Sequence, residues 1–142
     1  MMDESMTRTG VQDLATLIGR VLMSAPFIWA GYSKLITAAA TQAYFAKLGL
    51  PVPMLAWSVT VVIEFFGGLA LLLGVQARAV GIVLAAWCIA TALVAHTDFA
   101  DRNMQIHFLK NVIMAGGFLY VAAYGAGAYT VQQIFGRRAR AT

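Results

Sequence analysis

Charged residues are scarce in this sequence. They make up 11% of the 142 residues, whereas hydrophobic residues make up 61%, and the mean hydropathy is +0.76. A soluble domain usually carries about 25% charged residues, so this chain has too few to build a water-exposed surface. The composition therefore excludes an ordinary soluble domain and predicts an integral membrane protein.

Cysteine is almost absent, and the basic residues are thinly spread. The one cysteine, Cys88, cannot form an internal disulfide or a Cys-x-x-Cys pair, which excludes dithiol chemistry within one chain. The net charge of +4 comes from basic residues scattered between apolar runs, so we expect no nucleic acid partner. We expect Cys88 to be a small core residue.

Long apolar runs dominate the rest of the chain. Their lengths are close to the roughly 20 residues with which a helix crosses a bilayer. We therefore expect an all-α integral membrane four-helix bundle over residues 14–129, between a polar segment at 1–13 and a basic tail at 130–142. A short interfacial helix with Tyr44 and Phe45 is expected in the first loop. The four spans are expected at about 14–37, 52–75, 80–96 and 107–129.

The basic residues predict the topology. Four spans place both termini on one side, together with most of the arginines outside the spans. The positive-inside rule then predicts that the N- and C-termini are cytoplasmic. The arginine-rich tail would contact the anionic headgroups of membrane lipid. The arginines expected on the cytoplasmic side are Arg8, Arg78, Arg137, Arg138 and Arg140.

Glu64 lies at the centre of the second run. A carboxylate at this depth costs several kcal/mol unless it faces protein, a partner or water. Helical side chains lean towards the N-terminus of their own helix, so Lys34 leans inwards and Glu64 outwards, and the two converge. Lys34 is therefore the first candidate partner for Glu64, and Lys110 is the second. Arg20 leans back to the cytoplasm, and we interpret it as a membrane anchor.

The helix faces predict a polar cluster that opens outwards. Residues spaced by three, four and seven positions share one side of a helix, and such spacing brings the polar side chains of the first, second and fourth spans together. The alternative is that Lys34 and Glu64 form a structural ion pair and nothing more. We expect no metal site, because the histidines and aspartates match no closed metal pattern. The predicted ligand-binding residues are Lys34, Glu64, His107, Lys110, Asn111 and, at the rim, His96.

Several short motifs, in this order and spacing, resemble the DoxX family of small four-helix membrane proteins. The resemblance covers about residues 18–124 and implies a multi-pass protein of the bacterial inner membrane. Lys34, Glu64, Lys110 and Asn111 match polar positions that recur in the family. The motifs are Gly19-Arg20 with 31–35, the run 44–51, Glu64 to Gly68 followed by 71–74 and Arg78, and 107–111 before Gly116-Gly117.

The resemblance also suggests a function. The family takes its name from a small subunit of an archaeal quinol oxidase, and other members are associated with redox detoxification or methylamine utilisation. We therefore expect a redox-associated membrane subunit that binds a quinone or a similar lipophile. The sequence has no haem, flavin or iron–sulfur motif, so we expect no covalently bound cofactor and expect electrons to come from redox partner proteins.

Two other functions fit the same sequence. The chain could be a non-enzymatic scaffold that recruits partner proteins through its arginine tail and aromatic loop. A small transporter fits less well, because the sequence shows no inverted repeat. A transporter of this size would have to act as a homo-oligomer.

Overall fold

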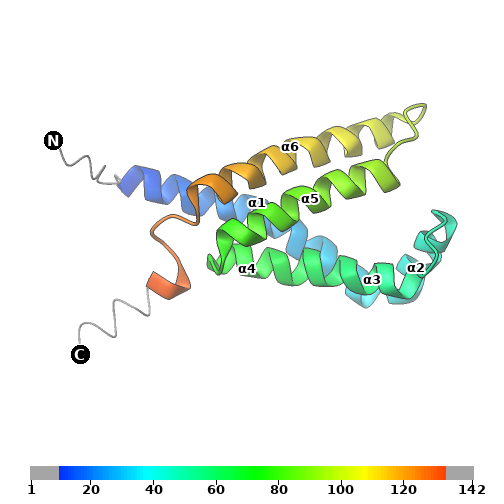
Figure 1. The fold of residues 1–142 in the computed structure, drawn as a ribbon, viewed down its shortest axis with the longest axis horizontal. Coiled ribbons are helices and arrows are strands. Elements are labelled where there is room, and N and C mark those ends of the chain that lie inside the picture. Colours follow the sequence, from blue (N-terminus) through cyan, green and yellow to red (C-terminus); the bar gives the residue numbers. More distant parts are fainter. Residues whose placement is uncertain (1–9, 134–142) are drawn as a thin grey trace.

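The computed structural model of the chain describes residues 10–133, which form helices and no strand (Figure 1). Three of the elements, α3, η1 and α4, follow one another without a break and form one continuous span. In chain order the elements are α1 (Gly10–Ile36), α2 (Ala38–Lys47), α3 (Pro53–Val61), η1 (Val62–Phe66), α4 (Gly67–Leu73), α5 (Ala77–Ala95) and α6 (Arg102–Tyr124).

Within the described residues, four helices are long and apolar enough to cross a membrane, as the sequence predicts. They are α1, the span Pro53–Leu73, α5 and α6. Gly10 and Gln133, the first and last described residues, lie at the same end of the bundle (Figure 1). The opposite end, which carries α2 and the loop between α5 and α6, is called the distal end below.

The fourth span starts and ends earlier than the predicted range 107–129. It starts at Arg102 because Asp101 caps it, with the Asp101 carboxylate accepting from the backbone N–H of Asn103 at 2.8 Å. It ends at Tyr124 because Gly125 has a φ of +80°, which a helix cannot accommodate. Of the predicted terminal segments, residues 1–9 and 134–142 lie outside the described residues.

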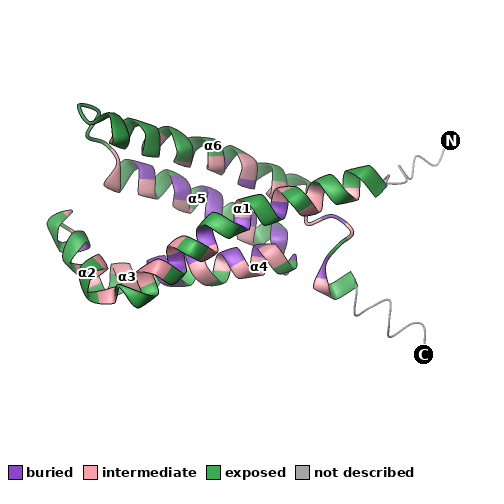
Figure 2. Ribbon diagram, turned by 180° about the vertical axis from the view of Figure 1, so that it is seen from behind, coloured by how far each residue is buried: buried purple, intermediate pink, exposed green. Residues whose placement is uncertain are grey.

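A compact core forms where α1, α4, α5 and α6 cross. The Phe27 and Phe118 rings meet edge to face with their centroids 5.1 Å apart, and Leu71, Leu84 and Cys88 pack around them. Cys88 is fully buried, as predicted for a core residue. Figure 2 shows that the buried residues gather along the middle of the bundle, while α6 is exposed over most of its length. The exposed apolar surface is the part that a bilayer would cover.

Arg20 has a different role from the predicted membrane anchor. It is 2% exposed, and its guanidinium donates to the backbone carbonyls of Ala126 and Tyr129, both at 2.6 Å. The side chain leans in the predicted direction, but backbone oxygens of the segment after α6 meet it there instead of lipid headgroups. Arg20 therefore fastens this segment to α1.

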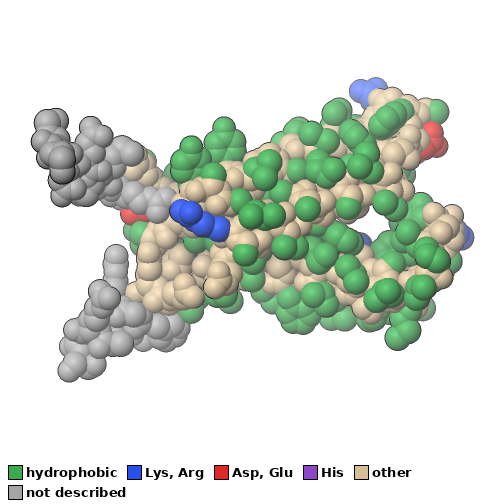
Figure 3. Space-filling model, in the orientation of Figure 1, with side chains coloured by type: hydrophobic (Ala, Val, Ile, Leu, Met, Phe, Trp, Pro, Cys, Tyr) green, Lys and Arg blue, Asp and Glu red, His purple; other side chains and the backbone are tan. Residues whose placement is uncertain are grey.

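The two halves of the molecule separate towards the distal end. The hairpin of α5 and α6 packs chiefly on α4 and η1, and the distal part of α3 runs away from it (Figure 1). Figure 3 shows an opening between the two halves at that end, with hydrophobic side chains around it. This separation creates the space that the candidate site occupies.

Candidate ligand-binding site

A cavity of about 520 Å³ lies between the two halves at the distal end. Its walls come from α2, α3 and α5, and the loop between α2 and α3 contributes Leu50 and Pro51. Lys34 from the end of α1 and Glu64 from η1 are the charged residues of its lining. The rest of the lining is almost entirely apolar, so the Lys34–Glu64 pair is the charged site in an otherwise hydrophobic cavity.

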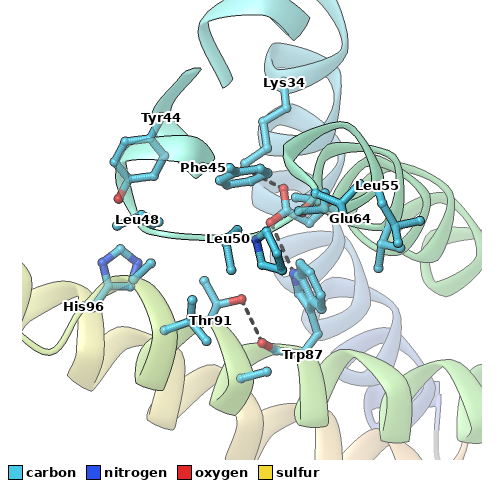
Figure 4. A pocket seen from close by; sticks show the side chains of 18 residues that line it. Lys34, Tyr44, Phe45, Leu48, Leu50, Leu55, Glu64, Trp87, Thr91 and His96 are labelled. Atoms are coloured by element: carbon cyan, nitrogen blue, oxygen red, sulfur yellow. Dashed lines mark hydrogen bonds and ion pairs between the residues drawn. The ribbon is translucent and has the colours of Figure 1, made fainter. Parts of the chain in front are cut away.

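Lys34 and Glu64 form the predicted ion pair. The Lys34 Nζ lies 2.6 Å from Oε2 of Glu64, and the two side chains are 29% and 9% exposed. Trp87 of α5 donates its indole N–H to the other carboxylate oxygen, Oε1, at 3.3 Å. Figure 4 shows Glu64 between Lys34 and Trp87. The carboxylate thus joins both halves of the molecule, and Lys34 rather than Lys110 is its partner.

A second tryptophan supports the lysine. Lys34 lies in the last turn of α1, where carbonyl groups lack a partner within the helix. The indole N–H of Trp57 on α3 donates to the Lys34 carbonyl oxygen at 2.8 Å. The end of α1 is therefore fixed to α3, and this holds the lysine over the carboxylate.

The helix is widened where Glu64 sits. Val62–Phe66 forms a π-helical turn inside an otherwise α-helical span. Such turns are rare and are often found at functional sites. The backbone of α1 touches this turn directly, since a Cβ placed on Gly31 would lie 2.5 Å from the backbone N of Phe65. The close approach brings Lys34, one turn further along α1, to the level of Glu64.

The threonine hydroxyl groups of the cavity donate within their own helices. Thr60 donates to the carbonyl of Ala56 at 2.7 Å, and Thr91 donates to that of Trp87 at 2.8 Å. Beside Glu64, the lining therefore offers a ligand the remaining N–H bonds of the Lys34 ammonium, and it also includes the Tyr44 hydroxyl and the His96 ring. It also offers the Glu64 carboxylate as an acceptor, because the bond to Trp87 is long.

The structure does not bring the predicted residues of the fourth span into the cavity. His107, Lys110 and Asn111 are absent from its lining, and Lys110 is exposed. The Asn111 amide donates to the carbonyl of His107 on its own helix at 2.9 Å. The prediction was wrong at this point because α6 packs mainly against α5, and α5 supplies the wall that α6 was expected to form.

His96 lies at the rim of the cavity, as predicted. Its ring stacks on that of His107, with the centroids 5.1 Å apart. Burial lowers the pKa of His96 below its ordinary value, and the nearby His107 adds to this effect. His107 thus contacts a lining residue without reaching the cavity. Among residues 10–133, no three His, Cys, Asp or Glu side chains lie close enough to hold a metal ion.

Trp87 is the site residue that sequence reasoning missed. Glu64 is the one acidic residue between Asp13 and Asp98, so it is the one carboxylate available deep in the spans. An indole N–H within an apolar helix also needs an acceptor. These two requirements together point to a contact between Glu64 and a tryptophan of the spans, and the structure identifies Trp87 among the three. Tyr44 and Phe45, which were expected in an interfacial helix, lie in α2 and also line the cavity, as does Leu48 after it.

Comparison with known proteins places the chain among small bacterial membrane proteins. A family model described as DoxX matches residues 15–97. "Inner membrane protein YqjF" of Escherichia coli (strain K12) is 35% identical over 90% of this chain and 97% of its own length. "Inner membrane protein YphA" of the same organism is 34% identical over 82% of this chain and 87% of its own length. No solved structure gives a significant match.

Proposed function

The chain belongs to the DoxX family and is a multi-pass inner-membrane protein, and from this premise we propose that it is a redox-associated membrane subunit that binds a quinone or a similar lipophile. One observation carries the proposal: a bridged ion pair, Lys34 with Glu64, forms the polar point of an otherwise apolar cavity between membrane spans. Ionisable residues inside a membrane usually mark a functional site.

The hydrogen-bonding groups of the cavity match the two states of a quinone. The Lys34 ammonium has N–H bonds to spare and suits a carbonyl oxygen, as an oxidised quinone presents. The Glu64 carboxylate can accept a bond from a hydroxyl group, as the reduced quinol presents. A purely apolar molecule would leave both groups unused, and a strongly charged one would have to cross the apolar lining.

The size and position of the cavity also support a lipophile. Small-molecule sites usually measure about 300–1,000 Å³ and are mostly apolar with a few polar groups, which describes this cavity. With cytoplasmic termini, the distal end and the cavity would lie in the outer half of the bilayer. Electrons would have to come from a redox partner protein, because the described side chains include no ligand set for a redox metal.

A binding experiment tests the proposal. Wild-type protein in lipid nanodiscs should bind a decyl benzoquinone saturably, and a decyl benzene without carbonyl groups should bind more weakly. Lys34→Met should weaken quinone binding by about 10–100-fold, the value of a hydrogen bond to a charged group. Lys110→Met is the matched control, since Lys110 lies outside the cavity. Absence of saturable binding, or an equal loss in both variants, would refute the proposal.

A further inference from the structure

The cavity opens on the flank of the molecule between α3 and α5. On the two spanning helices α3 and α5, four apolar residues belong to its lining and are at the same time exposed, so each faces both the cavity and the outside. They form two pairs, each spaced four residues apart along its helix and therefore one turn apart. The residues are Leu55 and Val59 on α3, and Ala90 and Val94 on α5; together they are called the slit.

The slit lies within the spans. Leu55 and Val59 belong to the span Pro53–Leu73, and Ala90 and Val94 belong to the span Ala77–Ala95. Each pair extends along its helix by about 6 Å, given the rise of about 1.5 Å per residue. All four side chains are apolar, so the surroundings that suit the slit are hydrocarbon chains and not water. Figure 3 shows the opening between the two halves in this region.

Other residues bound the distal side of the cavity. Tyr44, Phe45 and Leu48 of the α2 region, with Leu50 and Pro51 of the loop, form its distal wall. Phe45 is 9% exposed and is the buried residue of this wall, whereas Tyr44 is 43% exposed. Figure 4 shows Tyr44 and Leu48 on the side of the cavity away from Glu64, and Phe45 beside Lys34. The α2 region and the loop therefore bound the cavity distally, and the exposed part of the lining that lies within the spans is the slit.

The volume of the cavity sets a limit on what it encloses. A space of about 520 Å³ is suited to a ring headgroup and the first part of an alkyl chain. A longer chain has to leave the cavity, and the slit offers an exit that is apolar throughout. An apolar chain lying between the two helices would cover side chains that are otherwise half exposed or more, such as Leu55 at 60% and Val94 at 52%.

We propose that the slit is a lateral portal through which a single-tailed lipophile enters from the bilayer, and in which its tail lies while the headgroup contacts Lys34 and Glu64. This inference rests on the proposed function, since it needs a headgroup at the ion pair. It adds the class of ligand: an amphiphile dissolved in the membrane, with one apolar tail and a compact polar ring. A tail-less, water-soluble headgroup needs the ion pair but not the slit.

Two matched pairs of substitutions test the portal. Val94→Trp narrows the slit, and Leu93→Trp adds the same bulk to the adjacent residue, which is 59% exposed and does not line the cavity. On α3, Leu55→Trp is paired with Met54→Trp, since Met54 is 66% exposed and lies outside the lining. Binding of a decyl benzoquinone and of the same ring without a tail is measured by partition between nanodiscs with and without protein.

The portal predicts a selective loss. Val94→Trp and Leu55→Trp should raise the Kd of the tailed quinone about tenfold, equivalent to losing the burial of about two methylenes. The same variants should bind the tail-less ring as the wild type does, and the variants at Leu93 and Met54 should bind both. If a tryptophan variant is not monodisperse, Ala90→Leu replaces it in the test, because it narrows the slit by a smaller change.

The other outcomes separate the two proposals. Unchanged binding of the tailed quinone in both slit variants would overturn the portal and leave the proposed function standing. An equal loss at Leu93 or Met54 would also overturn it, because the effect would then come from bulk at the lipid surface. If the wild type binds neither quinone, the proposed function fails, and the portal fails with it.

Discussion

Replacing Lys34 with methionine should destabilise the protein much more than replacing Lys34 and Glu64 together. In Lys34→Met the Glu64 side chain, which is 9% exposed, keeps only the hydrogen bond from the indole N–H of Trp87 at 3.3 Å. Removing one member of a buried ion pair costs about 3–5 kcal/mol of unfolding free energy. Because the Lys34 side chain is 29% exposed, we expect the lower end of that range, about 3 kcal/mol.

The double variant Lys34→Met/Glu64→Leu removes both charges and keeps apolar bulk in their place. Replacing both members of a buried ion pair with apolar residues often leaves the unfolding free energy unchanged. The main cost here is that the Trp87 indole N–H loses its acceptor, which should lower the unfolding free energy by about 1 kcal/mol. Glu64→Leu alone should cost about 1 kcal/mol more than the double variant, since the ammonium loses its partner but is partly exposed. The single variants should therefore cost about 3 and 2 kcal/mol and the double variant about 1 kcal/mol, which gives a coupling energy of about 4 kcal/mol.

The free energies are measured by reversible unfolding in mixed micelles, followed by helical circular dichroism. A double variant as unstable as the sum of the single variants would show that the charges do not interact, and the reasoning would be wrong. The same double variant tests function separately. It should remain folded and lose quinone affinity by about 10–100-fold. Unchanged affinity would mean that the pair is structural only.

Three further predictions use other parts of the site. Gly31→Ala should lower the unfolding free energy by about 2–3 kcal/mol, because the new Cβ would lie 2.5 Å from the backbone N of Phe65. Gly19→Ala is the control: nothing lies within 4 Å of its Cβ, so the same assay should show no loss of stability. Trp87→Phe should raise the Kd for the quinone roughly threefold while the ring packing is kept; an unchanged Kd would exclude a role for the indole N–H. Burial and the nearby His107 lower the pKa of His96 in the folded protein. The contribution of His96 to stability should therefore be complete above 6.5, its pKa in the unfolded chain, and should be lost as the pH falls through the lower folded pKa. His96→Gln should flatten this dependence of the unfolding free energy on pH, and an unaltered slope would show that His96 is not its source.

The sequence was sufficient for the architecture and for the centre of the site. Runs of apolar residues predict the spans because a bilayer needs about 20 residues per helix, and no tertiary information enters that argument. The direction in which helical side chains lean made Lys34 the first candidate partner for the buried Glu64 and Lys110 the second, and the structure decides between them. The structure confirms both the four spans and the pair.

The arrangement of the helices around the pair could not be predicted in the same way. A helical wheel shows which residues share a face, but not which neighbour that face meets. His107, Lys110 and Asn111 share a face on α6, yet α6 packs on α5 and leaves them outside the cavity. The cavity itself results from the divergence of the two halves, which depends on interhelical angles and not on a motif.

The widened turn at Glu64 bears on the choice between a structural pair and a binding site. An ion pair between two regular helices needs only a lysine and a glutamate at matching heights. Here the helix departs from α geometry over Val62–Phe66, and Gly31 lets α1 contact the backbone of that turn. Departures of this kind weaken backbone hydrogen bonding and recur at functional sites. A pair whose sole task was to hold helices together would gain nothing from the widening, whereas a site that must aim a carboxylate at a ligand would. The cost of Gly31→Ala to quinone affinity, compared with its cost to stability, would then show how far binding depends on the shape of this turn.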